Sequence, residues 1–173
     1  TLYAQWQNEN WITIAAGSAT RTYDGTPLTI NNTQYTVKGN LSTGDSITDV
    51  VLSGTQTNVG TSATTVTSYR IVDAAGNDVT NSYKNVNTFN GTVEVTPRAL
   101  TVTADSTNKT YDGTALTDDK ATVGGTLVKG DSISYDVTGS VTDVASTATP
   151  NIVSNVKVMH TNADKTQTDV TGN

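Results

Sequence analysis

The chain has 173 residues, a hydrophobic fraction of 34%, a formal net charge of −6 and no cysteine. The lack of cysteine excludes disulfides, thiol catalysis and thiolate metal sites. The thinly spread acidic charge argues against binding of nucleic acid, whose phosphates need clustered Lys and Arg. The sequence contains no run of 18 apolar residues, so membrane insertion is not predicted.

Threonine dominates the composition. The chain contains 36 Thr, whereas Glu occurs twice and Met once. Thr and Val suit half-buried strands, because a branched side chain packs well on a pleated surface. No segment of a dozen residues repeats apolar side chains at the spacing of three, four and seven that an amphipathic helix requires. The composition therefore predicts an all-β protein.

The first part of the chain alternates apolar and polar side chains. Residues 1–10 show this strand pattern but have no counterpart later, so we interpret them as the tail strand of a preceding module or as a linker. The alternating segment 11–15 is predicted to be the first strand of a module. Residues 99–104 show the same period and are predicted to begin a second module.

A nine-residue string after the first strand is repeated. Residues 21–29 return as residues 109–117, with Tyr-Asp-Gly-Thr unchanged and the two tyrosines 88 residues apart. A repeat of this length is a small domain, so we predict two tandem modules. Asp-Gly is a turn signal, because Gly accepts a positive φ and Asp bonds its own downstream backbone. A structural role is predicted for Tyr23, Asp24, Gly25, Thr26, Tyr111, Asp112, Gly113 and Thr114.

A second motif, Gly-Asp-Ser-Ile, recurs in both modules and adds Gly44, Asp45, Gly130 and Asp131 to the structural set. Module one is predicted to span 11–97 and to close with a strand in residues 83–96. Module two is predicted to span 98–173 and to lack this closing strand. Because Pro97 stiffens a junction of one or two residues, we expect a semi-rigid, monomeric rod whose partners are neighbouring modules of the same polypeptide.

These motifs resemble a known family. Tyr-Asp-Gly-Thr, the Gly-Asp-Ser-Ile element and the closing Phe-Asn-Gly-Thr-Val-Glu-Val-Thr-Pro are similar to MBG/YDG-type repeats of bacterial surface proteins over residues 11–173. The string Thr-Leu-Tyr-Ala-Gln-Trp at the start resembles the closing strand of a Listeria–Bacteroides repeat. The resemblance implies an extracellular location on a bacterial cell surface, anchored to the cell wall through flanking regions.

Catalysis and cofactors are not expected. His160 is the only histidine and lies in a polar stretch, where we expect it to be exposed, and a triad or zinc site needs more nitrogen or sulfur ligands. The two Asp-Gly motifs could bind calcium, but no stretch has the dense oxygen spacing of a calcium loop, so turn capping is favoured. An intramolecular isopeptide bond from Lys109 to an Asn is a further alternative, although Arg21 stands at the matching place.

Aromatic side chains leave a binding role open. Tyr23 and Tyr111 could stack on sugars, but packing of each ring into the core of its own module is favoured. Trp6 and Trp11 are candidate ligand-contacting aromatics near the N-terminus.

Two functions follow from these expectations. The first is a non-catalytic structural spacer of a large adhesin-like protein, and the alternative is a module that binds host glycans or mucin-type glycoprotein. Each module is expected to be a small antiparallel β module, for which an immunoglobulin-like sandwich is favoured and a β-grasp-like sheet is the alternative.

Overall fold

A computed structural model describes residues 11–145 and 147–173 of the chain, and its contacts divide into two units. Unit 1 comprises residues 26–96 together with the residues before Tyr23, and unit 2 comprises residues 23–25 and 97–173. The predicted tail strand in residues 1–10 lies outside the described residues.

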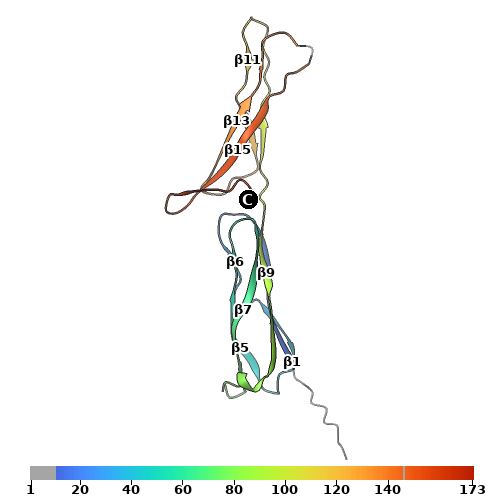
Figure 1. Ribbon diagram of the computed structural model, residues 1–173, viewed down its shortest axis with the longest axis vertical. Helices are drawn as coiled ribbons and strands as arrows, with labels where there is room; N and C mark the ends of the chain where they lie inside the picture. Colours follow the sequence, from blue (N-terminus) through green and yellow to red (C-terminus); the bar gives the residue numbers. More distant parts are fainter. Residues whose placement is uncertain (1–10, 146) are drawn as a thin grey trace, which may run out of the picture. The chain divides into compact units, whose positions relative to one another are not determined.

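The all-β prediction is confirmed (Figure 1). Unit 1 contains nine strands and one 3-10 turn: β1 (Trp11–Ala16), β2 (Ala19–Thr22), β3 (Leu28–Thr29), β4 (Tyr35–Gly39), β5 (Ser46–Ser53), β6 (Thr55–Gln56), β7 (Gly60–Val72), η1 (Thr80–Ser82), β8 (Asn85–Phe89) and β9 (Gly91–Thr96). Unit 2 contains β10 (Thr101–Ala104), β11 (Leu116–Thr117), β12 (Ala121–Gly124), β13 (Asp131–Thr138), β14 (Ser140–Val141), β15 (Ile152–Thr161) and β16 (Gln167–Asp169).

Two sheets form the body of unit 1. One has the strand order β4-β1-β8 and the other has the order β2-β9-β7-β5. Both contribute to one core, in which the alternating apolar residues of β1 meet those of β5, β7 and β9: Ile12, Ile14, Ala16, Ile30, Val50, Leu52, Ile71 and Val93. The period of two along each strand explains why one face is buried and the other is polar.

The closing strands of unit 1 pair in parallel with its opening strands. β1 pairs in parallel with β8 over five residue pairs, and β2 pairs in parallel with β9 over four. The prediction of antiparallel modules is therefore wrong for these two ladders, which are parallel. β9 also pairs antiparallel with β7, which places it between two neighbours (Figure 1).

Unit 2 repeats part of this arrangement. β10 pairs antiparallel with β12 as β1 does with β4, and β13 pairs with β15 as β5 does with β7. In the described part of unit 2, however, no strand pairs in parallel with β10. Between residues 97 and 173 the buried hydrophobic residues are Val158 and Val170, so the core of this unit is much smaller.

The long two-stranded ribbons carry irregularities at matching places. The register between β5 and β7 shifts after Thr48, and that between β13 and β15 shifts after Ser134. Asp49 has a φ of 50° and Asn155 a φ of 53°, the left-handed conformation that these short polar side chains tolerate best. Both ribbons are therefore bulged, which bends them and increases their twist.

The described residues contain no α-helix, and none of their elements is a helix long and apolar enough to cross a membrane. A β-grasp-like sheet therefore has no crossover helix in this part of the chain. The immunoglobulin-like arrangement stays a prediction.

We predict a large difference in sensitivity between the two cores. Val93→Ala, which removes two methyl groups from a fully buried side chain of unit 1, is expected to lower the free energy of unfolding by about 2 kcal/mol. The matched change Val102→Ala, at a partly exposed site of β10, is expected to cost less than about 1 kcal/mol. Urea and thermal denaturation followed by circular dichroism should show two transitions. A single sharp transition, or equal losses, would contradict the prediction.

Candidate functional site

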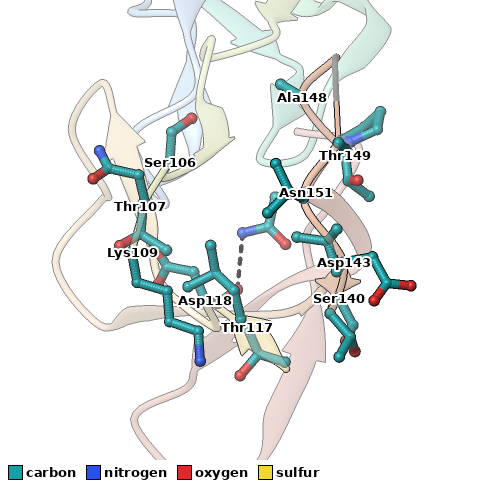
Figure 2. Close-up of a pocket in the computed structure, with 18 of the residues that line it drawn as sticks. Ser106, Thr107, Lys109, Thr117, Asp118, Ser140, Asp143, Ala148, Thr149 and Asn151 are labelled. Carbon is teal, nitrogen blue, oxygen red and sulfur yellow. Dashed lines mark hydrogen bonds between the residues drawn. The ribbon is translucent and has the colours of Figure 1, made fainter. Parts of the chain in front are cut away.

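A cavity of about 540 Å³ lies in unit 2 between residues 105–111 on one side and residues 139–145 and 147–151 on the other. Figure 2 shows Ser106, Thr107 and Lys109 on one side and Ala148, Thr149 and Asn151 on the other. The short strands β11 and β14 complete the wall and contribute the apolar side chains of Leu116 and Val141. The cavity therefore combines polar edges with a small apolar surface.

An ion pair organises one edge of the cavity. Lys109 Nζ lies 2.9 Å from Asp112 Oδ1 and also donates to Thr114 Oγ1 at 2.6 Å and to the carbonyl of Ala115 at 3.3 Å. The Lys109 ammonium and the N–H and hydroxyl of Thr114 hold the pKa of the Asp112 carboxyl well below its usual range. The carboxylate thus caps its own turn while the lysine ties the two arms of the turn together.

Asn151 bridges two segments at the opposite edge. Its side-chain Nδ2 donates to the carbonyl of Asp105 at 3.2 Å and to the carbonyl of Asp118 at 2.8 Å, the contact dashed in Figure 2. Its Oδ1 is buried without a hydrogen-bond partner. Buried polar atoms are almost always paired in native structures, so this wall is incompletely satisfied.

The described lining of the cavity offers hydrogen-bonding groups and apolar contact. Its Lys109 is fully engaged, and the described lining contains no His or Cys. No group of three or more His, Asp or Glu that could hold a metal occurs among the described residues. These side chains can hold a partner through backbone and hydroxyl hydrogen bonds and apolar contact.

The Tyr-Asp-Gly-Thr motifs lie at turns. Gly25 has a φ of 77° and Gly113 a φ of 79°, the conformation for which glycine is favoured. Asp112 Oδ1 accepts from the N–H and hydroxyl of Thr114 at 2.9 and 2.8 Å. For Asp112, the capping alternative to calcium ligation is therefore the arrangement observed in unit 2.

The two motif tyrosines differ. Tyr23 is 3% exposed but belongs to unit 2, whereas Tyr111 is 58% exposed. Packing of each ring into the core of its own module was therefore wrong, because Tyr111 lies at the open cavity, where nothing in the described chain covers it. Burial, aided by the nearby carboxylate of Asp131, raises the pKa of the Tyr23 phenol.

The two Gly-Asp-Ser-Ile motifs are also turns, since Gly44 and Gly130 have φ of 92° and 93°. The carboxylates that follow the two glycines have different partners. Tyr83 Oη donates to Asp45 Oδ2 at 2.5 Å, whereas Asp131 Oδ1 lies 2.6 Å from His160 Nδ1.

The expectation of an exposed, isolated His160 was wrong. Its side chain is 20% exposed, and that of Asp131 is 3% exposed. The pair was missed because the two residues are brought together only by the register of β13 with β15, in which Asp131 lies opposite His160.

The two candidate ligand-contacting aromatics were Trp6 and Trp11. Trp6 lies outside the described residues. Trp11, at the start of β1, is 54% exposed and does not line the cavity.

We predict that Lys109 controls the titration of Asp112. Lys109→Met is expected to raise the pKa of Asp112 toward its ordinary value near 3.9, as measured by NMR of the carboxyl carbon. Because the folded-state pKa lies below that of the unfolded chain, this contact stabilises the fold above pH about 4 and is lost as the pH falls. Asp164, whose pKa is lowered by Thr166, should not change. An unchanged pKa of Asp112 would contradict the assignment.

Comparisons with models of protein families, with curated proteins and with solved structures found no match. The resemblance to surface-protein repeats is therefore carried by the sequence motifs alone, and any function of this chain follows from the arrangement of its strands and its cavity.

Proposed function

We propose that the chain is a non-catalytic, load-bearing spacer of an extracellular bacterial adhesin-like protein. The observation that supports this most is the parallel pairing of the opening strands of unit 1 with its closing strands. The setting on a cell surface rests on the resemblance of the repeated motifs.

Parallel pairing decides how a module responds to tension. The chain enters unit 1 at β1 and leaves it after β9, and parallel neighbours place these two points at opposite ends of the shared ladder. A pull on the two points slides the strands along each other, so the inter-strand hydrogen bonds are loaded together. A pull on the open end of an antiparallel pair breaks its bonds one after another. The first geometry has the higher barrier to forced unfolding.

Side chains reinforce this ladder. Val93 and Val95 of β9 are 0% and 2% exposed, so sliding of the strand would bring apolar side chains out of the core. Thr64, which is fully buried, donates from Oγ1 to the carbonyl of Gly17 at 2.6 Å, beside the point where β9 begins. The closing strand is thus held by core packing as well as by its ladders.

We predict that unit 1 resists force directionally. Cysteine handles can be placed uniquely, because the chain has no native cysteine. Handles at Trp11→Cys and Pro97→Cys load the parallel ladders in shear, and handles at Ser46→Cys and Ala74→Cys peel β5 from β7 at its open end. Single-molecule pulling is expected to give an unfolding force at least about twofold higher for the first pair. Equal forces, or the reverse order, would contradict a load-bearing role.

A second candidate function, recognition of host glycans or mucin, is favoured by the exposure of two aromatic rings in unit 1. Trp11 is 54% exposed and Phe89 is 57% exposed, and aromatic faces are common sugar platforms. This candidate predicts retention on a glycan array that Trp11→Ala and Phe89→Ala abolish. Retention that survives both changes, or no retention at all, would contradict it.

A further inference from the structure

The two units correspond residue by residue around the cavity. Lys109 stands at the place of Arg21, so residues 107–110 correspond to β2. The pairing of β5 with β7 and of β13 with β15 aligns Thr65 with Ile152, so residues 147–151 correspond to the first residues of β7. In both units the last residue of this segment, Thr64 or Asn151, donates its side chain to the matching carbonyl, that of Gly17 or Asp105.

In unit 1 a strand lies between these two segments. β9 pairs with β2 on one side and with residues 60–64 of β7 on the other. In unit 2 the 540 Å³ cavity lies between the matching segments, with Thr107 and Lys109 facing Ala148 and Thr149 (Figure 2). Residues 107–110 form no strand, although their counterparts 19–22 do. The cavity therefore occupies the place of β9.

A second cavity, of about 390 Å³, lies beside β10, the counterpart of β1. In unit 1, β8 covers the edge of β1 that β4 leaves open. In unit 2, β10 contributes the side chains of Leu100 and Val102 to this cavity, together with Val156 and Val158 of β15. The two cavities together follow the path that the continuous β8–β9 segment takes in unit 1.

Burial differs accordingly. Ile12 and Ile14 of β1 are fully buried in the core of unit 1, whereas their counterparts Leu100 and Val102 are partly exposed. Val156 in β15 is exposed as well, although it belongs to the strand that forms the floor. Unit 2 thus has the apolar floor of a complete module without the strand that covers it in unit 1.

We propose that unit 2 carries an acceptor groove, formed by the two cavities, for one extended polypeptide segment with the chemistry of β8–β9. The edges of a groove of this kind bind by β-augmentation, in which main-chain hydrogen bonds give affinity and alternate side chains fill apolar pockets. The buried, unpaired Oδ1 of Asn151 is a further sign that this wall is incomplete.

The structure of unit 1 defines what the bound segment requires. β-Branched apolar side chains are needed at the places of Val93 and Val95, which point into the core. Glycine is needed at the place of Gly91, because a Cβ there would lie 2.2 Å from the carbonyl oxygen of Gly17. The matching carbonyl in unit 2 is that of Asp105, which Asn151 holds in the same way. The groove therefore selects for both alternation and a small residue.

The test uses the full chain and a fluorescent synthetic peptide with the sequence of residues 85–96. Saturable binding in fluorescence anisotropy is expected. A peptide with Val93→Asp and Val95→Asp should bind at least about tenfold more weakly, because each buried charge costs well over 1.4 kcal/mol. A peptide with Gly91→Val should also bind more weakly. The peptide with Thr92→Ser and Glu94→Gln, changed only at exposed positions, is the matched control and should bind like the parent.

Hydrogen exchange locates the bound peptide. Slower exchange is expected for residues 101–104 and 107–110, while the exposed hairpin at 162–166 stays unchanged. Protection confined to unit 1 would mean displacement of β9 and would overturn the proposal. Self-association of the chain that protects 107–110 without peptide would assign the groove to a second copy and would overturn it too.

A covalently attached segment allows the test even where the affinity of the free peptide is too weak to measure. Residues 83–97 are appended after Asn173 through a flexible linker, which raises the effective concentration to about millimolar. The thermal transition of unit 2 should then rise, and the same extension with the two valines replaced by Asp should leave it unchanged. No rise with the native segment, together with no binding of the free peptide, would overturn the proposal.

Discussion

The position of β9 is the constraint on which unit 1 depends. The strand lies between β2 and β7, so it satisfies backbone groups on both of its edges, and its two valines fill the centre of the core. A central strand cannot be removed without opening two ladders and one core together. The close approach of Gly91, at the start of β9, to the backbone of Gly17 also belongs to this arrangement.

Unit 2 is an internal comparison that isolates the effect of that strand. The ladders of β10 with β12 and of β13 with β15 form without a closing strand, since each is local and has its own register. The segment 107–110 forms no strand, because its counterpart β2 in unit 1 is held extended by pairing with β9. Local β-propensity is therefore sufficient for the antiparallel ribbons, but the parallel ladders require a partner distant in sequence.

The fold class could be predicted because it depends on period-two patterns and turn chemistry, both local. The repeated Asp-Gly and Gly-Asp strings likewise indicate turns, and Gly25, Gly44, Gly113 and Gly130 all have positive φ. The parallel pairing of β1 with β8 could not be predicted, since strand direction in a sheet depends on the path of the whole chain. The exposure of Tyr111 and the contact of His160 with Asp131 could not be predicted for the same reason. Each depends on which distant segment of the chain packs against the residue.

The cavity shows the same limit. Most of its lining residues are Thr, Asn, Asp and Ser, which are common in turns, and their sequence pattern does not indicate a binding site. The cavity becomes visible only when Asn151 is placed opposite residues 105–110. Its Nδ2 preserves a contact that Thr64 makes in unit 1, so the wall is built even where the strand beside it is missing.

The bulges at Asp49 and Asn155 affect whether strands of one module can pair with strands of another module. β5 and β13 are outer strands of their sheets, and repeated modules present similar outer strands at high local concentration. A regular outer strand would offer its free amides and carbonyls to the same strand of another module, which leads to exchanged or stacked sheets. Asp49 lies in the outer strand β5 itself, whereas Asn155 lies in β15, the neighbour of the outer strand β13. Each bulge bends the pair of strands to which an outer strand belongs and so disturbs its row of donors and acceptors. The irregularities that interrupt these ladders are thus a means by which tandem copies with similar sequences fold as separate neighbours.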